Sequence, residues 1–143
     1  MITIDRTLEA TVPASAVWAR CYADPSGWSQ WNPEIASAEM QGPFEVGSTA
    51  RVRFKTGLRL RFRLVEVEQG RMFTDEARLP GARMGHRHLL EPTDTGVRLR
   101  NTIYFEGPLS RLWAALMRKR ATRAIEEGQR RAAALAAGLP TPG

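Results

Sequence analysis

The stretch STARVRFKTGLRLRFRLVEVEQG, residues 48–70, alternates apolar and charged side chains with unusual regularity. Strict alternation is typical of a β-strand that buries one face and leaves the other in water. Thr56-Gly57 in the middle of the stretch is typical of a tight turn, so the pattern predicts a hairpin of two strands. The predicted inner face carries Val52, Phe54, Leu58, Leu60, Phe62 and Leu64, and the predicted outer face carries Arg51, Arg53, Lys55, Arg59, Arg61 and Arg63.

Similar alternation occurs on both sides of this hairpin. In residues 71–80, however, Glu76 and Arg78 alternate too loosely with their apolar neighbours for the pattern to assign a face. Short connections rich in glycine and proline separate most of the segments, which favours antiparallel pairing. With the hairpin, the sequence predicts about seven strands, the others covering residues 2–12, 34–41, 71–80, 82–92 and 97–107.

Helical patterns follow the first strand and the last one. Residues 13–24 place four apolar side chains on one side of a short helix, which Pro25 ends. Trp28 and Trp31 are three residues apart, so they share one side of a second short helical turn. After residue 108, apolar side chains recur every three or four positions up to Gly138, which predicts one long amphipathic helix of roughly eight turns.

These elements predict an α+β fold. The strands offer one apolar face and the long helix offers one apolar stripe, so each is expected to bury the other. A strongly curved antiparallel sheet wrapped over a C-terminal helix is expected to leave a hollow between them. We expect a single domain over residues 1–138 and a disordered tail over residues 139–143.

The bulk composition is that of an ordinary soluble globular protein, with 43% hydrophobic and 25% charged residues in 143. Cys21 is the only cysteine, which excludes an internal disulfide and a cysteine-rich metal site. No apolar run approaches the roughly 18 residues of a membrane span. The N-terminus lacks a basic flank followed by an apolar block, so no signal peptide is expected and a cytoplasmic location is the default.

The net charge of +6 raises the question of an anionic partner. The basic row on the outer face of the hairpin lacks the interleaved aromatic side chains that stack on bases, because the aromatics alternate to the other face. A solvated face is therefore expected, with no sequence-specific binding of nucleic acid. Weak contact with an anionic membrane surface or an acidic partner stays open as an alternative.

Three polar side chains fall on faces that are otherwise apolar. His86 and His88 are two residues apart on a predicted strand, so both share its inner face with Met84 and Leu90. Asn101 interrupts the apolar face of the next strand, where it either points inward or marks a bulge. Each histidine is interpreted either as a hydrogen-bonded core residue or as a ligand contact. No third ligand recurs at a suitable spacing, so no metal site is expected.

Two segments of the sequence resemble the helix-grip superfamily that includes START-like lipid-transfer domains, the birch-pollen-allergen fold and bacterial polyketide cyclase/dehydrase proteins (SRPBCC). They are PASAVWARCYADPSGWSQWNPEI, residues 13–35, and HRHLLEP with TGVRLRNTIYFEGPLSRLW, within residues 86–113. The resemblance implies a ligand cavity between sheet and helix, closed at one end by the segment of Trp28 and Trp31. Members bind lipids, polyketides, sterols, hormones or quinones; others are chaperone activators, and a minority are enzymes.

Three hypotheses of function follow from the resemblance. The first is a binding or carrier protein for a small apolar molecule, without a cofactor, as a monomer or a homodimer. The second is an enzyme of the cyclase/dehydratase kind that uses His86 or His88 as general acid or base. The third is an interaction protein with a filled core and an exposed apolar patch. The predicted ligand contacts are Trp28, Trp31, Phe54, Phe62, Met84, His86, His88, Asn101, Ile103, Phe105, Trp113 and Met117.

Overall fold

A computed structural model describes residues 1–139. Most of the tail predicted to be disordered, residues 140–143, lies outside the described residues. Within them, no helix is long and apolar enough to cross a membrane. The strands are β1 (Ile2–Ala10), β2 (Ile35–Gln41), β3 (Thr49–Phe54), β4 (Arg59–Glu68), β5 (Met72–Leu79), β6 (Ala82–Pro92) and β7 (Val97–Glu106), and the helices are α1 (Ala14–Val17), η1 (Trp18–Tyr22), η2 (Pro25–Gln30) and α2 (Ser110–Ala136).

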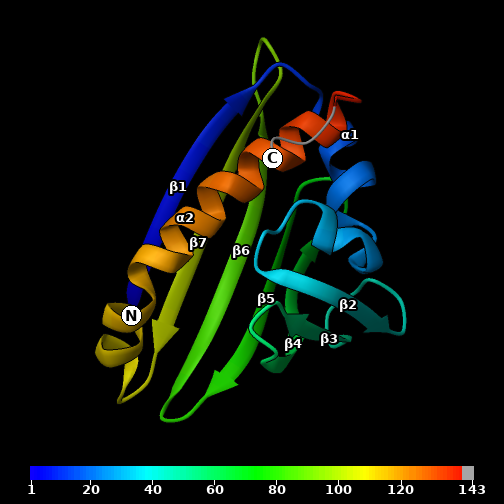
Figure 1. The fold of residues 1–143 in the computed structure, drawn as a ribbon. Coiled ribbons are helices and arrows are strands. Elements are labelled where there is room, and N and C mark those ends of the chain that lie inside the picture. The colour runs from blue at the N-terminus through cyan, green and yellow to red at the C-terminus, as the bar shows by residue number, and fades with distance from the viewer. Residues whose placement is uncertain (140–143) are drawn as a thin grey trace.

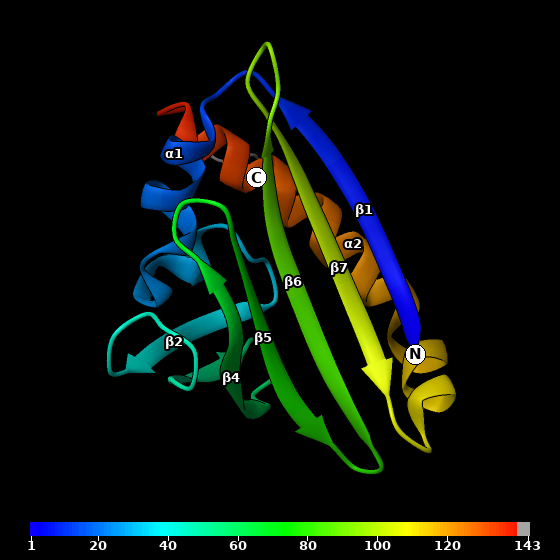
Figure 2. The ribbon, with the colours of Figure 1, turned by 180° about the vertical axis from the view of Figure 1, so that it is seen from behind.

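The seven strands form one antiparallel sheet, as predicted, and their order in it is β1-β7-β6-β5-β4-β3-β2. The sheet bends so that β2, β3 and β4 turn across one end of the long strands, while α2 runs along its inner face (Figure 1). From behind, β1, β7 and β6 cover the helix (Figure 2). The predicted α+β architecture, a curved sheet around a C-terminal helix, is confirmed.

The short helices explain why a segment rich in helix breakers carries two tryptophans. The side chain of Asp24 caps η2 by accepting from the backbone N–H of Ser26 at 3.1 Å. The Nε1–H of Trp28 donates to the Tyr22 carbonyl at 3.1 Å, and the Nε1–H of Trp31 donates to the Cys21 carbonyl at 3.0 Å. Both indoles are buried. They tie η2 to η1 and fill the end of the sheet, which only large side chains can do.

The hairpin of residues 48–70 differs from its prediction at one position. Leu58 is 55% exposed, because it belongs to the turn and β4 begins one residue later. A positive φ at Gly57 makes this turn tight, so the side chain of Leu58 is carried past the edge of the sheet. The rest of the alternation is confirmed, and the side chains of the predicted basic row are exposed: Arg51, Arg53, Lys55, Arg59, Arg61 and Arg63.

Helix α2 has 27 residues and packs mainly on β1 and β7. Its apolar stripe is buried only in part. Leu112 and Leu116, which the periodicity places on that stripe, are 52% and 67% exposed. The buried positions are small or lie in the second half of the helix: Ala114, Ala121, Ile125, Gly128, Gln129 and Ala132.

Two supports hold α2 to the rest of the fold. At its start, the backbone N–H of Leu109 donates to the Gly81 carbonyl at 2.9 Å, and the Nε1–H of Trp113 donates to the Pro80 carbonyl at 2.8 Å. Farther along, Gly128 faces the backbone of Trp31, where an added Cβ would be in van der Waals contact with the Trp31 carbonyl oxygen at 3.4 Å. Between these supports the helix spans a hollow.

Candidate functional site

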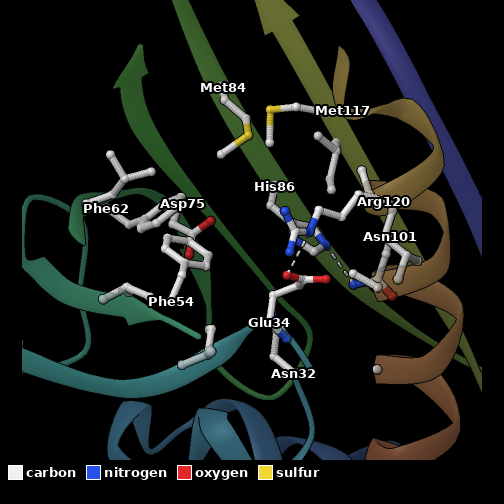
Figure 3. A pocket seen from close by; sticks show the side chains of 18 of the residues that line it. Asn32, Glu34, Phe54, Phe62, Asp75, Met84, His86, Asn101, Met117 and Arg120 are labelled. Carbon is white, nitrogen blue, oxygen red and sulfur yellow. Dashed lines mark hydrogen bonds and ion pairs between the residues drawn. The ribbon is translucent and has the colours of Figure 1, made fainter. Parts of the chain in front are cut away.

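A cavity of about 580 Å³ lies between the sheet and α2. Its walls come from the inner faces of β3 to β7, from the short helices and from α2 (Figure 3). Most of the side chains on the wall are apolar, because the strands alternate and present mainly their inner faces to it. Every predicted ligand contact except Phe105 lies on this wall: Trp28, Trp31, Phe54, Phe62, Met84, His86, His88, Asn101, Ile103, Trp113 and Met117.

Phe105 is the exception, and its assignment to the cavity is wrong. Its side chain is fully buried, so the predicted face is correct. In the sheet it pairs with Met84 of β6 on one side and with Ile2 of β1 on the other, near the end of β7, and it belongs to the packed core there. Alternation along a strand determines the face of a side chain, but not whether the space above it is filled.

Asn101 organises the polar part of the cavity wall. It points inward, and the pairing of β6 with β7 runs through His88 and Asn101 without a shift, so no bulge occurs there. The Asn101 Nδ2 donates to His86 Nε2 at 3.1 Å and to His88 Nδ1 at 3.0 Å. Its Oδ1 accepts from Gln129 Nε2 at 2.9 Å.

Gln129 determines which way this network runs. Its Nε2 also faces two backbone carbonyls, of Leu99 at 3.1 Å and of Arg6 at 3.0 Å, so it must be the donor toward Asn101. The Asn101 amide nitrogen therefore faces the histidines, and each imidazole accepts a hydrogen bond on the nitrogen that faces Asn101. An imidazole that accepts is neutral, with its proton on the other ring nitrogen.

Burial also favours the neutral form of both histidines, in agreement with their hydrogen bonds. It lowers the pKa of His86 to about 3, because a charged ring in this apolar surrounding loses its hydration. The pKa of His88 is also lowered well below its usual value, first by burial and then by His86. No group of three potential metal ligands occurs among residues 1–139.

Four rings stack in a column that runs from the short helices into the cavity. Trp28 lies on Phe73 with ring centroids 5.5 Å apart and an interplanar angle of 12°. Phe73 lies on His88 at 4.2 Å and 13°, and His88 lies on His86 at 3.8 Å and 23°. The column and the Asn101 bonds together leave the histidine rings little freedom, so the polar wall is preorganised.

Asp75 is a cavity residue that the sequence reasoning missed. It lies on the inner face of β5, opposite His86 in the register, and is 6% exposed. The pKa of its carboxyl group is raised to about 7, mainly by burial and to a smaller extent by the neighbouring Glu76. The signal was available, because Asp75 shares a two-residue period with the apolar Phe73 and Ala77, which are both buried.

The opening of the cavity is crossed by an ion pair. Arg120 of α2 contacts Glu34, which lies just before β2, with an Nε to Oε2 distance of 3.1 Å (Figure 3). Leu58 from the β3–β4 turn and Leu116 from α2 also lie on the wall and are exposed. The rim of the cavity therefore combines apolar side chains with one solvated ion pair, whose contribution to stability is small.

Three solved structures share this fold at low sequence identity. Protein MLL2253 from Mesorhizobium loti has a TM-score of 0.76 over 97% of this chain and 99% of its own, at 16% identity. Ara h 8.0201 has a TM-score of 0.71 over 96% of this chain and 98% of its own, at 13% identity. The di-domain ARO/CYC StfQ from the steffimycin biosynthetic pathway has a TM-score of 0.78 over 95% of this chain and 50% of its own, at 15% identity.

Sequence comparison agrees with the structural comparison. No curated protein gives a significant match. One family model, described as polyketide cyclase / dehydrase and lipid transport, matches residues 1–137. This range includes every strand and all of α2, so the match covers the complete cavity as well as the fold. The chain belongs to the polyketide cyclase / dehydrase and lipid transport family and has the helix-grip fold that its sequence resembles.

Proposed function

We propose that this protein binds a small, largely apolar molecule in the cavity between the sheet and α2 and holds it there without chemical change. The observation that carries the proposal is the cavity itself, about 580 Å³ with a mostly apolar wall. This volume is within the range of roughly 300–1,000 Å³ that is typical of small-molecule sites. Family membership supports the same kind of ligand.

The polar cluster supports binding over acid–base catalysis by histidine. An effective general base has a pKa near the working pH. His86 has a pKa of about 3, and both His86 and His88 already accept hydrogen bonds from Asn101. Neither ring is then a useful base near neutral pH, whereas both can orient a ligand. The interaction-protein hypothesis expects a filled core, and a cavity of this size argues against it.

The test is to fill the cavity by mutation. Ile103 is 8% exposed and lies on the cavity wall, so Ile103→Trp should occupy the ligand volume. An environment-sensitive apolar dye should bind the wild-type protein with micromolar affinity, about 8 kcal/mol, and should fail to bind this variant. Native mass spectrometry of the purified wild-type protein should show a co-purified apolar molecule that the variant lacks.

Leu112→Trp is the matched control. It adds the same side chain to α2 at a position that is 52% exposed and not on the cavity wall, so dye binding should be unchanged. Circular dichroism should report the wild-type fold for both variants. A folded Ile103→Trp protein that binds the dye as well as the control does would contradict the proposal.

A further inference from the structure

Asp75 carries the one buried oxygen of the cavity wall that the protein leaves without a partner. Its Oδ1 is buried and accepts no hydrogen bond within residues 1–139, and in that range only Arg131 Nε shares this condition. Arg131 has an ion pair with Glu127 through its Nη2, whereas no ion pair involves Asp75 among those residues. An orphaned buried acceptor is rare in folded proteins and calls for a missing partner.

The position of Asp75 shows where that partner must lie. The carboxyl group points into the cavity (Figure 3). The other ionisable side chains on the wall are already engaged or lie toward the opening. His86 and His88 are neutral and bonded to Asn101, and Arg120 pairs with Glu34. The remaining two are Tyr22, which is fully buried, and Arg78, which is exposed.

His86 supplies a donor next to this acceptor. Since its Nε2 accepts from Asn101, its proton is on Nδ1, and no hydrogen bond within residues 1–139 uses that N–H. His86 pairs directly with Asp75 across β5 and β6. An acceptor and a donor on adjacent strands form a complementary pair for a group that both donates and accepts. A hydroxyl group does both, whereas an ammonium group only donates and an ether or ketone only accepts.

We infer that Asp75 and His86 form the polar anchor of the cavity, and that the ligand is an apolar molecule with a hydroxyl group at its buried end. The hydroxyl donates to the carboxyl group of Asp75 and accepts from His86 Nδ1–H, and the apolar body occupies the rest of the cavity. This inference rests on the proposed function, because it assumes that the cavity holds a ligand. It adds the chemical class of that ligand and assigns Asp75 as a specificity-determining residue.

Matched probes test the anchor. 2-Naphthol has the hydroxyl group, 2-methoxynaphthalene has the same ring system with the donor blocked, and 1-naphthylmethylamine has a cation instead. By isothermal titration calorimetry at about pH 8.5, where Asp75 is ionised and can only accept, the wild-type protein should bind 2-naphthol at least tenfold more tightly than 2-methoxynaphthalene. An unmade hydrogen bond leaves the carboxylate buried and unpaired. In Asp75→Leu this preference should disappear while 2-methoxynaphthalene binds as well as before. Asp75→Asn retains an acceptor oxygen and should keep part of the preference.

The outcomes separate the anchor from the cavity. If 2-naphthol and 2-methoxynaphthalene bind equally to the wild-type protein and to Asp75→Leu, yet Ile103→Trp excludes both, the anchor is wrong and the cavity proposal holds. If Ile103→Trp excludes neither, the proposed function itself fails. Tighter binding of 1-naphthylmethylamine than of 2-naphthol, lost in Asp75→Leu, would overturn the hydroxyl in favour of a cation. Thermal unfolding should show that both Asp75 variants fold, because Asp75→Leu removes an unpaired buried oxygen and Asp75→Asn removes a buried charge.

Discussion

The two halves of α2 use apolar residues in opposite ways. The first half carries the large side chains Leu112, Leu116 and Met117, yet Leu112 and Leu116 are among its exposed positions. In the second half Ile125, Gly128, Gln129 and Ala132 are buried. The glycine at position 128 lets the helix approach the backbone of Trp31, whereas the large side chains Leu116 and Met117 lie on the cavity wall. The cavity therefore lies under both halves of the helix, and the two halves differ in how much of their apolar surface is exposed.

The largest effect on stability is expected where the second half of α2 meets the polar cluster around Asn101. Gln129→Leu has a similar volume but removes the donor that faces Asn101 Oδ1 and the carbonyls of Leu99 and Arg6. Each unsatisfied buried acceptor costs about 1–3 kcal/mol, so we expect the free energy of unfolding to fall by about 3 kcal/mol. Urea unfolding measures this. A loss below about 1 kcal/mol would mean that water replaces the amide and that these hydrogen bonds do not hold the second half of α2 to the sheet.

A smaller loss of stability is expected from adding a side chain where α2 contacts the backbone of Trp31. Gly128→Leu adds side-chain atoms against the Trp31 backbone, and overpacking of this kind costs about 1–3 kcal/mol. Ala124→Leu, one turn earlier on the cavity wall, adds one carbon fewer and should cost less than 1 kcal/mol. The difference in urea midpoints between the two variants measures the contrast between tight and open packing. Equal midpoints would remove the contrast.

The buried ionisable groups under the helix predict a pH dependence of stability. His86 has a pKa of about 3 in the folded chain against 6.5 in the unfolded chain, so the unfolded chain binds more protons below 6.5 and stability falls as pH falls from 6.5 toward 3. His88 acts in the same direction. Asp75 has the opposite sign, because its folded pKa of about 7 lies above its usual 3.8 and stability falls as pH rises between those values.

Asp75→Asn should therefore sharpen the pH dependence. Relative to the wild-type protein, this variant should gain stability steadily from pH 4 to pH 7 and keep a constant advantage above pH 7. Its own stability should fall more steeply on acidification below pH 6.5, because the histidines are no longer offset. Urea midpoints of the two proteins at a series of pH values test this, and a difference that does not vary with pH would show that Asp75 is not buried as described.

The smallest effect on stability is expected from the exposed side chains in the first half of α2. Leu112→Ser and Leu116→Ser change side chains that are 52% and 67% exposed, so the free energy of unfolding should change by no more than about 0.5 kcal/mol. Thermal unfolding of both variants checks this. A loss of 2 kcal/mol in either one would mean that the first half of α2 packs on the sheet, as the apolar periodicity alone predicts.

Alternation along the strands was enough to predict the inner face of the sheet. It placed His86 and His88 on the inner face and left Asn101 open between the inner face and a bulge; the structure brings all three together. The same rule applied to Asp75 would have found that residue. Which inward-facing side chains line the cavity depends on the spacing between sheet and helix. The periodicity assigns both Leu116 and Phe105 to an apolar face, yet Leu116 is exposed and Phe105 is packed in the core. Hydrophobic periodicity carries no information about that distance.

Amide chemical shifts during a titration with 2-naphthol test the central claim most directly, namely that the hollow between the sheet and α2 is a binding site. The account predicts saturable shifts at His86, Met117 and Ala121, which lie on the cavity wall. It also predicts unchanged chemical shifts at two positions away from the wall. These are Ala132, which is buried near the end of α2, and Arg61, which lies on the outer face of the sheet. Shifts confined to the outer face, or spread evenly along α2, would contradict it.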